Sequence, residues 1–70
     1  EEQLEAESLM QIIQQLPEGY RLVFNMYAIE GYSHKEIAEK LAITESTSKS
    51  QYSRAKSTLR EVLKKYNIER

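Results

Sequence analysis

The strongest constraint on the fold is an apolar run over residues 20–29, in which only Arg21 and Asn25 are polar. These two residues lie four positions apart, so in a helix they share one narrow face. A helix that is apolar on almost all its other sides needs neighbours on several of them. Pro17 before the run suits the first turn of a helix, and Gly31 after it suits the residue beyond a helix end. The run therefore predicts a central helix from about Pro17 to Glu30, packed on several sides.

Two signals for helix starts follow the apolar run. Ser33 is followed three residues later by Glu36, which is the pattern of a capping box. After a short break, Thr44 is a natural N-cap for another helix. These signals predict a short third helix over residues 34–41 and a long fourth helix over residues 45–66.

A first helix is predicted over residues 3–15, because apolar residues recur there at helical spacing and Pro17 then stops the pattern. Its stripe comprises Leu9, Ile12, Ile13 and Leu16. No segment alternates with the period of a strand. We therefore expect an all-α protein, a compact bundle of about four helices in a single domain that covers residues 1–70. Because the sequence begins with Glu1 rather than methionine, we expect a fragment of a longer protein.

The composition disfavours several classes of function. The chain has no cysteine, which removes disulfides, thiolate metal sites and cysteine nucleophiles, and its single histidine argues against a histidine-based metal site. No nucleophile–base pair and no glycine-rich phosphate loop is visible. No apolar run approaches the roughly 20 residues of a membrane span. We therefore expect no enzyme, no cofactor, no metal, no small-molecule ligand and no membrane partner.

The net charge of −1 conceals an uneven distribution. Residues 1–43 hold three basic and eight acidic residues, a net charge of −5. Residues 44–70 hold seven basic and three acidic residues, a net charge of +4. This division points to an anionic partner for the C-terminal third, although an ordinary basic, solvent-exposed helix face explains it equally well.

The predicted fourth helix carries small polar side chains on one face. Its apolar residues lie on the opposite arc of the helical wheel and are Tyr52, Ala55, Leu59, Val62, Leu63 and Tyr66. Eight of the fifteen residues over 44–58 are serine or threonine, which are indifferent helix formers. A solvated face ordinarily carries Glu, Lys, Gln or Ala instead. Short polar side chains let a helix approach another surface closely and donate to phosphates or base edges. The outward residues are Ser46, Ser50, Ser53, Arg54 and Ser57, with Lys49 on the flank.

The third and fourth predicted helices together follow the plan of a helix-turn-helix over about residues 33–60. Ala38 is expected where the two helices cross, and Ile43 is expected to fill the gap at the turn. The N-terminal half of the second helix of such a motif enters the major groove of DNA. Many helical bundles contain similar corners, so this pattern alone leaves a DNA-free function open.

Several short pieces of the chain match one family in spacing and residue type. They are Leu16-Pro17 with Arg21 and Phe24; Glu30-Gly31-Tyr32-Ser33; Glu36-Ile37-Ala38-Glu39; and Lys49-Ser50 followed by Ser53-Arg54-Ala55. With them, about residues 9–65 resemble the fourth conserved region of bacterial RNA polymerase sigma factors, most closely the compact extracytoplasmic-function (ECF) type. The resemblance implies a cytoplasmic transcription-initiation domain of four helices that binds the −35 promoter element. It also implies docking on the β-subunit flap of RNA polymerase and masking by an anti-sigma factor.

The resemblance also implies roles for individual residues, carried over position by position. Arg54 would read a guanine through its forked guanidinium group, and Lys49 would hold either a phosphate or a base. Arg21 and Lys35 are candidate phosphate contacts outside the recognition helix, with a local ion pair to a glutamate as the alternative for Arg21. The residues expected to face the major groove are Thr47, Lys49, Ser50, Ser53 and Arg54.

Three residues depart from the pattern of the resembling family. Ala42 stands where glycine is frequent, so slight strain is expected in the turn. Ser48 stands where a valine usually packs inward, so a weaker local core is expected, with the serine hydroxyl bonded back to the carbonyl oxygen of Thr44. Gln51 stands where arginine is frequent, so one cationic contact is missing. These departures leave the exact promoter sequence open.

The histidine, aromatic and methionine side chains are expected either in the core or near the DNA backbone. His34 lies in the first turn of its helix, where the positive dipole end favours a neutral ring, and is expected on the surface near the DNA backbone. The rings of Tyr20 and Tyr27 are expected in the core, with their hydroxyl groups in contact with water, rather than as stacking platforms for bases. Core positions are expected for Tyr20, Tyr27, Phe24, Met10 and Met26.

Two other functions are open on the residues alone. A LuxR-type response-regulator DNA-binding domain shares the helix-turn-helix and the Glu-Ile-Ala-Glu-Lys-Leu segment over 36–41, but Leu16-Pro17 and the segment over 48–56 fit the sigma family better. A protein-interaction bundle that never touches DNA is mildly favoured by the acidic N-terminal two-thirds and the net charge of −1.

Overall fold

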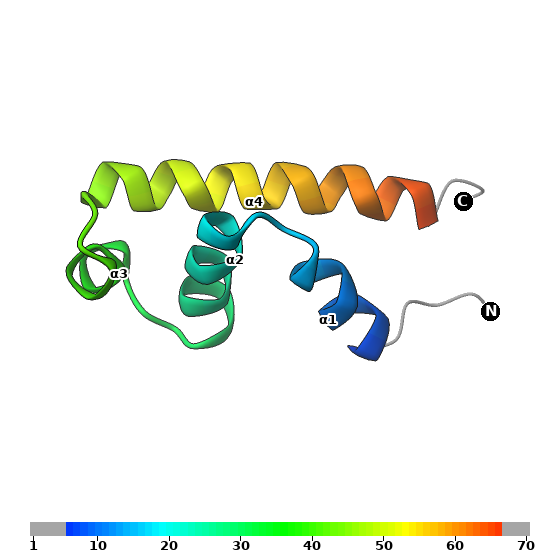
Figure 1. The fold of residues 1–70 in the computed structure, drawn as a ribbon, viewed down its shortest axis with the longest axis horizontal. Coiled ribbons are helices and arrows are strands. Elements are labelled where there is room, and N and C mark those ends of the chain that lie inside the picture. Colours follow the sequence, from blue (N-terminus) through cyan, green and yellow to red (C-terminus); the bar gives the residue numbers. More distant parts are fainter. Residues whose placement is uncertain (1–5, 67–70) are drawn as a thin grey trace.

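The longest element of the protein is a straight helix along which the others are arranged (Figure 1). The computed structural model describes the main chain of residues 6–66 and the side chains of residues 10–64. Helices α1, α2 and α3 lie along one side of α4 (Figure 1), and the described part of the chain contains no strand, so the all-α prediction is confirmed. The elements are α1 (Ala6–Gln14), α2 (Glu18–Phe24), the π-helical turn η1 (Asn25–Ile29), α3 (His34–Leu41) and α4 (Glu45–Tyr66).

The main apolar cluster joins α1 to the second half of α4. Two of the buried side chains come from α1, one is Leu16 in the turn that follows it, and two come from α4. The side chain of Leu9, which belongs to the same predicted stripe as Leu16, lies outside the described residues, as do residues 3–5 of the predicted first helix. The cluster consists of Ile12, Ile13, Leu16, Ala55 and Leu59, with Tyr20, Phe24, Val62 and Leu63 packed half-buried against it.

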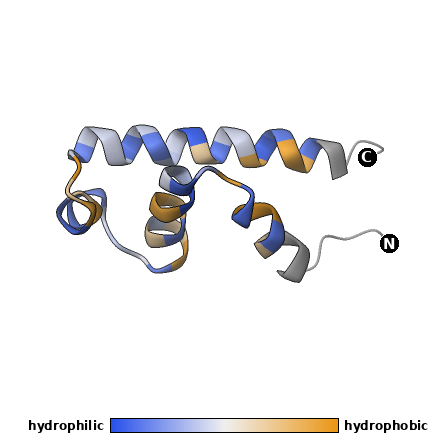
Figure 2. Ribbon diagram, in the orientation of Figure 1, coloured by the Kyte–Doolittle hydropathy of each residue, from blue (hydrophilic) through white to orange (hydrophobic). Residues whose placement is uncertain are grey.

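The apolar run over residues 20–29 is far less buried than its composition predicts. Within it, only Val23 is buried, whereas Leu22 is 41% exposed and Ile29 is 57% exposed. The run has neighbours on several sides, since it contacts α4, α3 and, through Tyr20 and Phe24, the cluster that includes α1. The extensive burial that its composition predicts is wrong. Its α2 part packs chiefly on α4, and η1 lies against α3. Figure 2 shows apolar residues along α2, and several residues of the run stay exposed to solvent.

Two other core predictions also differ from the structure. Met10 is 47% exposed, and Tyr27 is exposed with its ring stacked on another side chain. Tyr20, Phe24 and Met26 are half-buried. The predicted single helix is also divided, because η1 replaces the last turns with the wider π-helical winding.

The predicted caps of α3 and α4 are confirmed. The Glu36 amide donates to Ser33 Oγ at 3.1 Å, and the Ser33 amide donates to Glu36 Oε1 at 2.9 Å, which completes the capping box. The Thr47 amide donates to Thr44 Oγ1 at 2.9 Å at the start of α4. Each bond satisfies an amide that has no partner inside its helix, so side-chain chemistry sets where both helices begin.

The turn between α3 and α4 depends on a left-handed residue. Ala42 has φ 58° and ψ 44°, the αL conformation that a Cβ atom disfavours. Its neighbour Ile43 is half-buried and donates its amide to the Ala38 carbonyl oxygen at 3.0 Å, which closes the end of α3. The strain expected from alanine at this position is therefore present in the main chain.

Gly19 allows α2 to approach α4 closely. A Cβ atom at this position would lie 2.8 Å from Oε1 of Gln51, so the end of that side chain occupies the space that a larger residue would need. Gln51, which stands where the resembling family often has arginine, is therefore partly buried at the α2–α4 crossing.

Candidate nucleic-acid interface

The first half of α4 presents basic and small polar side chains on one face. Lys49, Ser50, Ser53 and Arg54 are exposed there, and their spacing keeps them on one side of the helix. The residue before them, Ser48, is fully buried on the other side. The structure therefore brings these four predicted contacts together on a single surface.

Thr47, the fifth predicted contact on α4, lies at the edge of this surface. It is half-buried, and its hydroxyl accepts a hydrogen bond of 2.9 Å from the Thr44 hydroxyl. Because the Thr44 proton is used in this bond, the Thr47 hydroxyl keeps its own proton available as a donor. The N-cap turn thus fixes the Thr47 side chain, and its hydroxyl can still donate one hydrogen bond to an external partner.

The two long cations of this face are free to meet an anion. Within the described part of the chain, neither Lys49 nor Arg54 forms an ion pair, so no carboxylate neutralises them. Lys56 differs, because its Nζ lies 5.1 Å from the centroid of the Tyr52 ring in a cation–π contact on the flank of the helix. An anionic partner would therefore meet the charges of Lys49 and Arg54 first.

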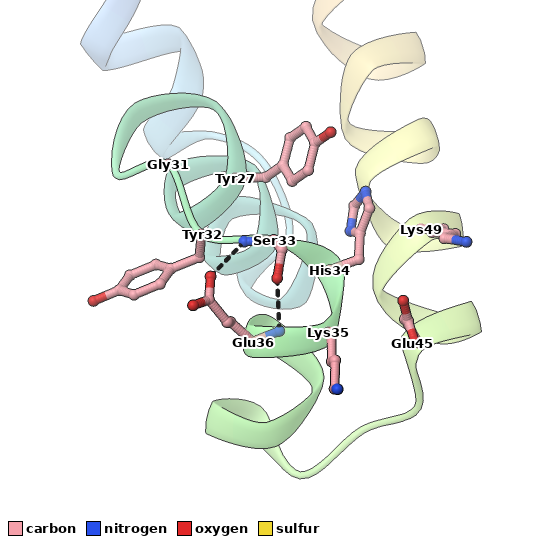
Figure 3. A pocket seen from close by; sticks show the side chains of 9 residues that line it. All are labelled: Tyr27, Gly31, Tyr32, Ser33, His34, Lys35, Glu36, Glu45 and Lys49. Atoms are coloured by element: carbon pink, nitrogen blue, oxygen red, sulfur yellow. Dashed lines mark hydrogen bonds between the residues drawn. The ribbon is translucent and has the colours of Figure 1, made fainter.

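A groove of about 610 Å³ lies between α3 and the start of α4, and it brings Lys35 of α3 close to the basic face of α4 (Figure 3). Lys35 comes from α3 and Lys49 from α4, and both line this groove. The structure therefore places the Lys35 side chain beside the start of α4, and its contact with a phosphate stays a prediction. The groove is lined by Tyr27, Gly31, Tyr32, Ser33, His34, Lys35, Glu36, Glu45 and Lys49.

Arg21 is not part of this surface arrangement. Its Nη1 donates to the main-chain carbonyl oxygen of Gln14 at 3.0 Å and lies 3.5 Å from that of Leu16. These carbonyl oxygens lie at the end of α1, where they lack partners inside the helix. The guanidinium group thus caps α1. Among the side chains that the structure describes, it has neither the ion pair to a glutamate considered as an alternative nor a hydrogen bond to α4.

His34 and Ser48 form a contact that the sequence did not predict. The Nδ1 atom of His34 lies 2.8 Å from Oγ of Ser48, and the ring stacks on Tyr27 with centroids 4.2 Å apart. His34 is therefore a half-buried link between helices rather than a surface residue, and the expected bond from the Ser48 hydroxyl to Thr44 is not the one observed. A polar residue at an inward-facing position of α4 was the available signal, because a buried hydroxyl requires a partner.

The residues that the structure describes include no group of histidine and carboxylate side chains that could hold a metal ion. None of the helices in that part is long and apolar enough to traverse a lipid bilayer. The geometry of the site is that of an exposed, basic helix face backed by a capped helix-turn-helix.

Residues 6–59 match the family model described as Sigma-70, region 4. The match covers most of the chain, and the chain belongs to this family. Comparisons with curated proteins and with solved structures found no match. The protein is thus a promoter-binding sigma-factor domain, and promoter DNA and RNA polymerase are the partners of this family.

Proposed function

We propose that this domain binds the −35 promoter element through the helix that begins after Thr44, as part of an alternative sigma factor of the ECF type. The observation that carries the proposal is the single exposed face formed by Lys49, Ser50, Ser53 and Arg54 in the first half of α4. A helix of this kind places its N-terminal half in the major groove, where small side chains permit close approach. The domain acts in the cytoplasm as a binding module, without enzymatic activity, cofactor or metal.

The proposed roles follow from the chemistry of each side chain. Arg54 reads a guanine, because its guanidinium fork matches the two acceptors of that base. Lys49 and Lys35 hold phosphates on either side of the groove that they share. Thr47 and the two exposed serines contribute hydroxyl donors. A phosphate contact by Arg21 requires its unused guanidinium nitrogens, because Nη1 is bound to α1.

The same proposal includes a docking surface for RNA polymerase, at the flap of the β-subunit, and for an anti-sigma factor. The supporting observation is that Leu22 on α2 and Ile29 on η1 are apolar and exposed. They lie outside α4, which carries the residues proposed to face the major groove. Burial of apolar side chains against a protein partner is favourable, whereas the DNA backbone offers charged phosphates, so these residues suit a protein contact better than a DNA contact.

The proposal is tested with the 70-residue chain and a pool of randomised double-stranded DNA. Rounds of selection, followed by fluorescence anisotropy on one selected duplex and one scrambled duplex of equal composition, measure both affinity and discrimination. We expect tighter binding of the selected duplex and a steep loss of affinity as salt increases. Failure to enrich any sequence, or a binding constant insensitive to salt, would favour the protein-interaction bundle and contradict the proposal.

A further inference from the structure

The two halves of α4 are held to the rest of the protein in different ways. The second half carries Ala55 and Leu59, which belong to the main apolar cluster with α1. In the first half, over residues 45–54, the buried residue is Ser48, whose exposed fraction is 0%. The half of α4 that faces DNA in the proposed function is therefore anchored at a polar side chain.

The Ser48 hydroxyl is bonded to a ring that is itself fixed on other sides. His34 Nδ1 lies 2.8 Å from Ser48 Oγ, and the imidazole stacks on the Tyr27 ring at 4.2 Å with an angle of 11° between the planes. The edge of the imidazole also meets Tyr52, with centroids 5.8 Å apart. His34 thus connects α3, η1 and two successive turns of α4.

Apolar burial is of a different physical kind. Ile37 of α3 is fully buried, and buried apolar area stabilises packing without fixing a direction. A hydrogen bond weakens steeply when its length or angle changes, so the contact between His34 and Ser48 restricts both the rotation and the position of α4. Ser48 directly precedes Lys49, and Tyr52 directly precedes Ser53, so the restricted residues adjoin the DNA-facing ones.

We infer that His34 and Ser48 are positioning residues for promoter recognition. Their hydrogen bond sets the register of the first half of α4 relative to α3, and thereby aims Lys49, Ser53 and Arg54 at the major groove. The inference rests on the proposed function and deepens it, since it assigns a role in base discrimination to two residues that need not touch DNA. Base readout depends on hydrogen-bond geometry, whereas phosphate attraction tolerates a displaced helix.

Three single variants and one double variant separate positioning from stability. His34→Phe keeps a flat ring against Tyr27 but loses the bond to Ser48. His34→Asn keeps a polar atom at the position of Nδ1 but loses the stacked ring. Ser48→Ala removes the hydroxyl. The double variant His34→Phe with Ser48→Ala removes both polar partners, which restores much of the stability lost when one partner is left buried and unpaired.

The measured quantities are the ratio of affinities for the selected and scrambled duplexes, and the midpoint of thermal unfolding. We expect the ratio to fall about fivefold in His34→Phe and in Ser48→Ala, the size of one hydrogen bond, and to fall no further in the double variant. The double variant is expected to regain its unfolding midpoint while its ratio stays low. His34→Asn is expected to keep most of the ratio of the unaltered chain.

A purely structural role predicts a different result. In the double variant, the ratio of affinities for the selected and scrambled duplexes would then recover together with the unfolding midpoint. That outcome would overturn the inference and leave the proposed function intact. Unchanged discrimination in both His34→Phe and Ser48→Ala would overturn it equally. If the unaltered chain binds no duplex, the proposed function fails, and the inference fails with it.

Discussion

Nη1 of Arg21 donates to the main-chain carbonyl oxygen of Gln14 at 3.0 Å, so a side chain of α2 closes the end of α1. The two helices are separated by a short turn that contains Pro17, which lacks an amide proton and therefore leaves the α1 carbonyl oxygens without a main-chain donor at that position. The side chain of Arg21 supplies the donor instead. This bond connects the first helix, whose apolar stripe holds α4, to the helix that follows it.

Replacing Arg21 with methionine is expected to lower the free energy of unfolding by about 1 kcal/mol, because the aliphatic part is kept and the charged donor is lost. Urea denaturation followed by circular dichroism measures the change. Lys35→Met is the matched control, since this exposed cation is expected to affect DNA binding and leave stability unchanged. If Arg21→Met instead keeps full stability and reduces the salt dependence of DNA binding, the guanidinium group holds a phosphate rather than α1.

Ala42→Gly is expected to raise the free energy of unfolding by about 0.5–1 kcal/mol. Ala42 adopts a left-handed conformation at φ 58°, which glycine occupies without the steric cost of a Cβ atom. Denaturant titration is again the measurement. Gly31, at φ 82° with open space around its Cα, gives the converse control: Gly31→Ala is expected to destabilise the protein for the same reason. A loss of stability in Ala42→Gly would show that the gain in unfolded-state entropy outweighs the relief of strain.

Thr44→Ala is expected to lower the free energy of unfolding by about 1 kcal/mol, because the Thr47 amide at the start of α4 loses its acceptor. Thr44→Ser keeps an oxygen in the same place and serves as the control, with near-normal stability expected. Hydrogen exchange measured by NMR locates the effect, since faster exchange is expected in the first turn of α4 and not in the second half of that helix. Uniform acceleration along the whole helix would contradict a local capping role.

The starts of α3 and α4 were predictable because the chemistry that sets them is local. Ser33 and Glu36 are three residues apart, as are Thr44 and Thr47, so each cap involves residues within a single helical turn. The solvent-facing side of α4 was equally predictable from the sequence. A helical wheel places Ser50 and Arg54 opposite the buried positions, independently of how the rest of the chain packs. Local spacing therefore predicted the frame of the helix-turn-helix.

The exposure of the apolar run was not predictable in the same way. Burial of Leu22 or Ile29 depends on how closely other helices surround α2 and η1, and both side chains remain exposed although α2 packs on α4 and η1 on α3. The bond between His34 and Ser48 joins residues fourteen positions apart across the turn, so their meeting depends on the angle between two helices. The exposure of the apolar run and the bond between these two residues both depend on tertiary packing. The periodicity of residues within one helix does not predict how helices pack on one another.

Arg54 and Lys49 are exposed on the same face of α4, and the proposed function gives them different dependences on DNA sequence. Arg54→Ala is expected to cost about 1–3 kcal/mol on the selected duplex and little on the scrambled one, because a base contact is lost. Lys49→Ala is expected to weaken both duplexes alike and to reduce the slope of log affinity against log salt by about 1, because a phosphate contact is lost.

Lys64→Ala is the control for both variants, since it removes an exposed cation from the other end of the same helix. It is expected to change neither discrimination nor slope, because the second half of α4 does not enter the groove in the proposed orientation. Anisotropy titrations over a range of salt concentrations provide all three comparisons on one pair of duplexes. A uniform loss in Arg54→Ala would show that this residue binds phosphate, and an equal effect in Lys64→Ala would show that the basic helix attracts DNA without the predicted orientation.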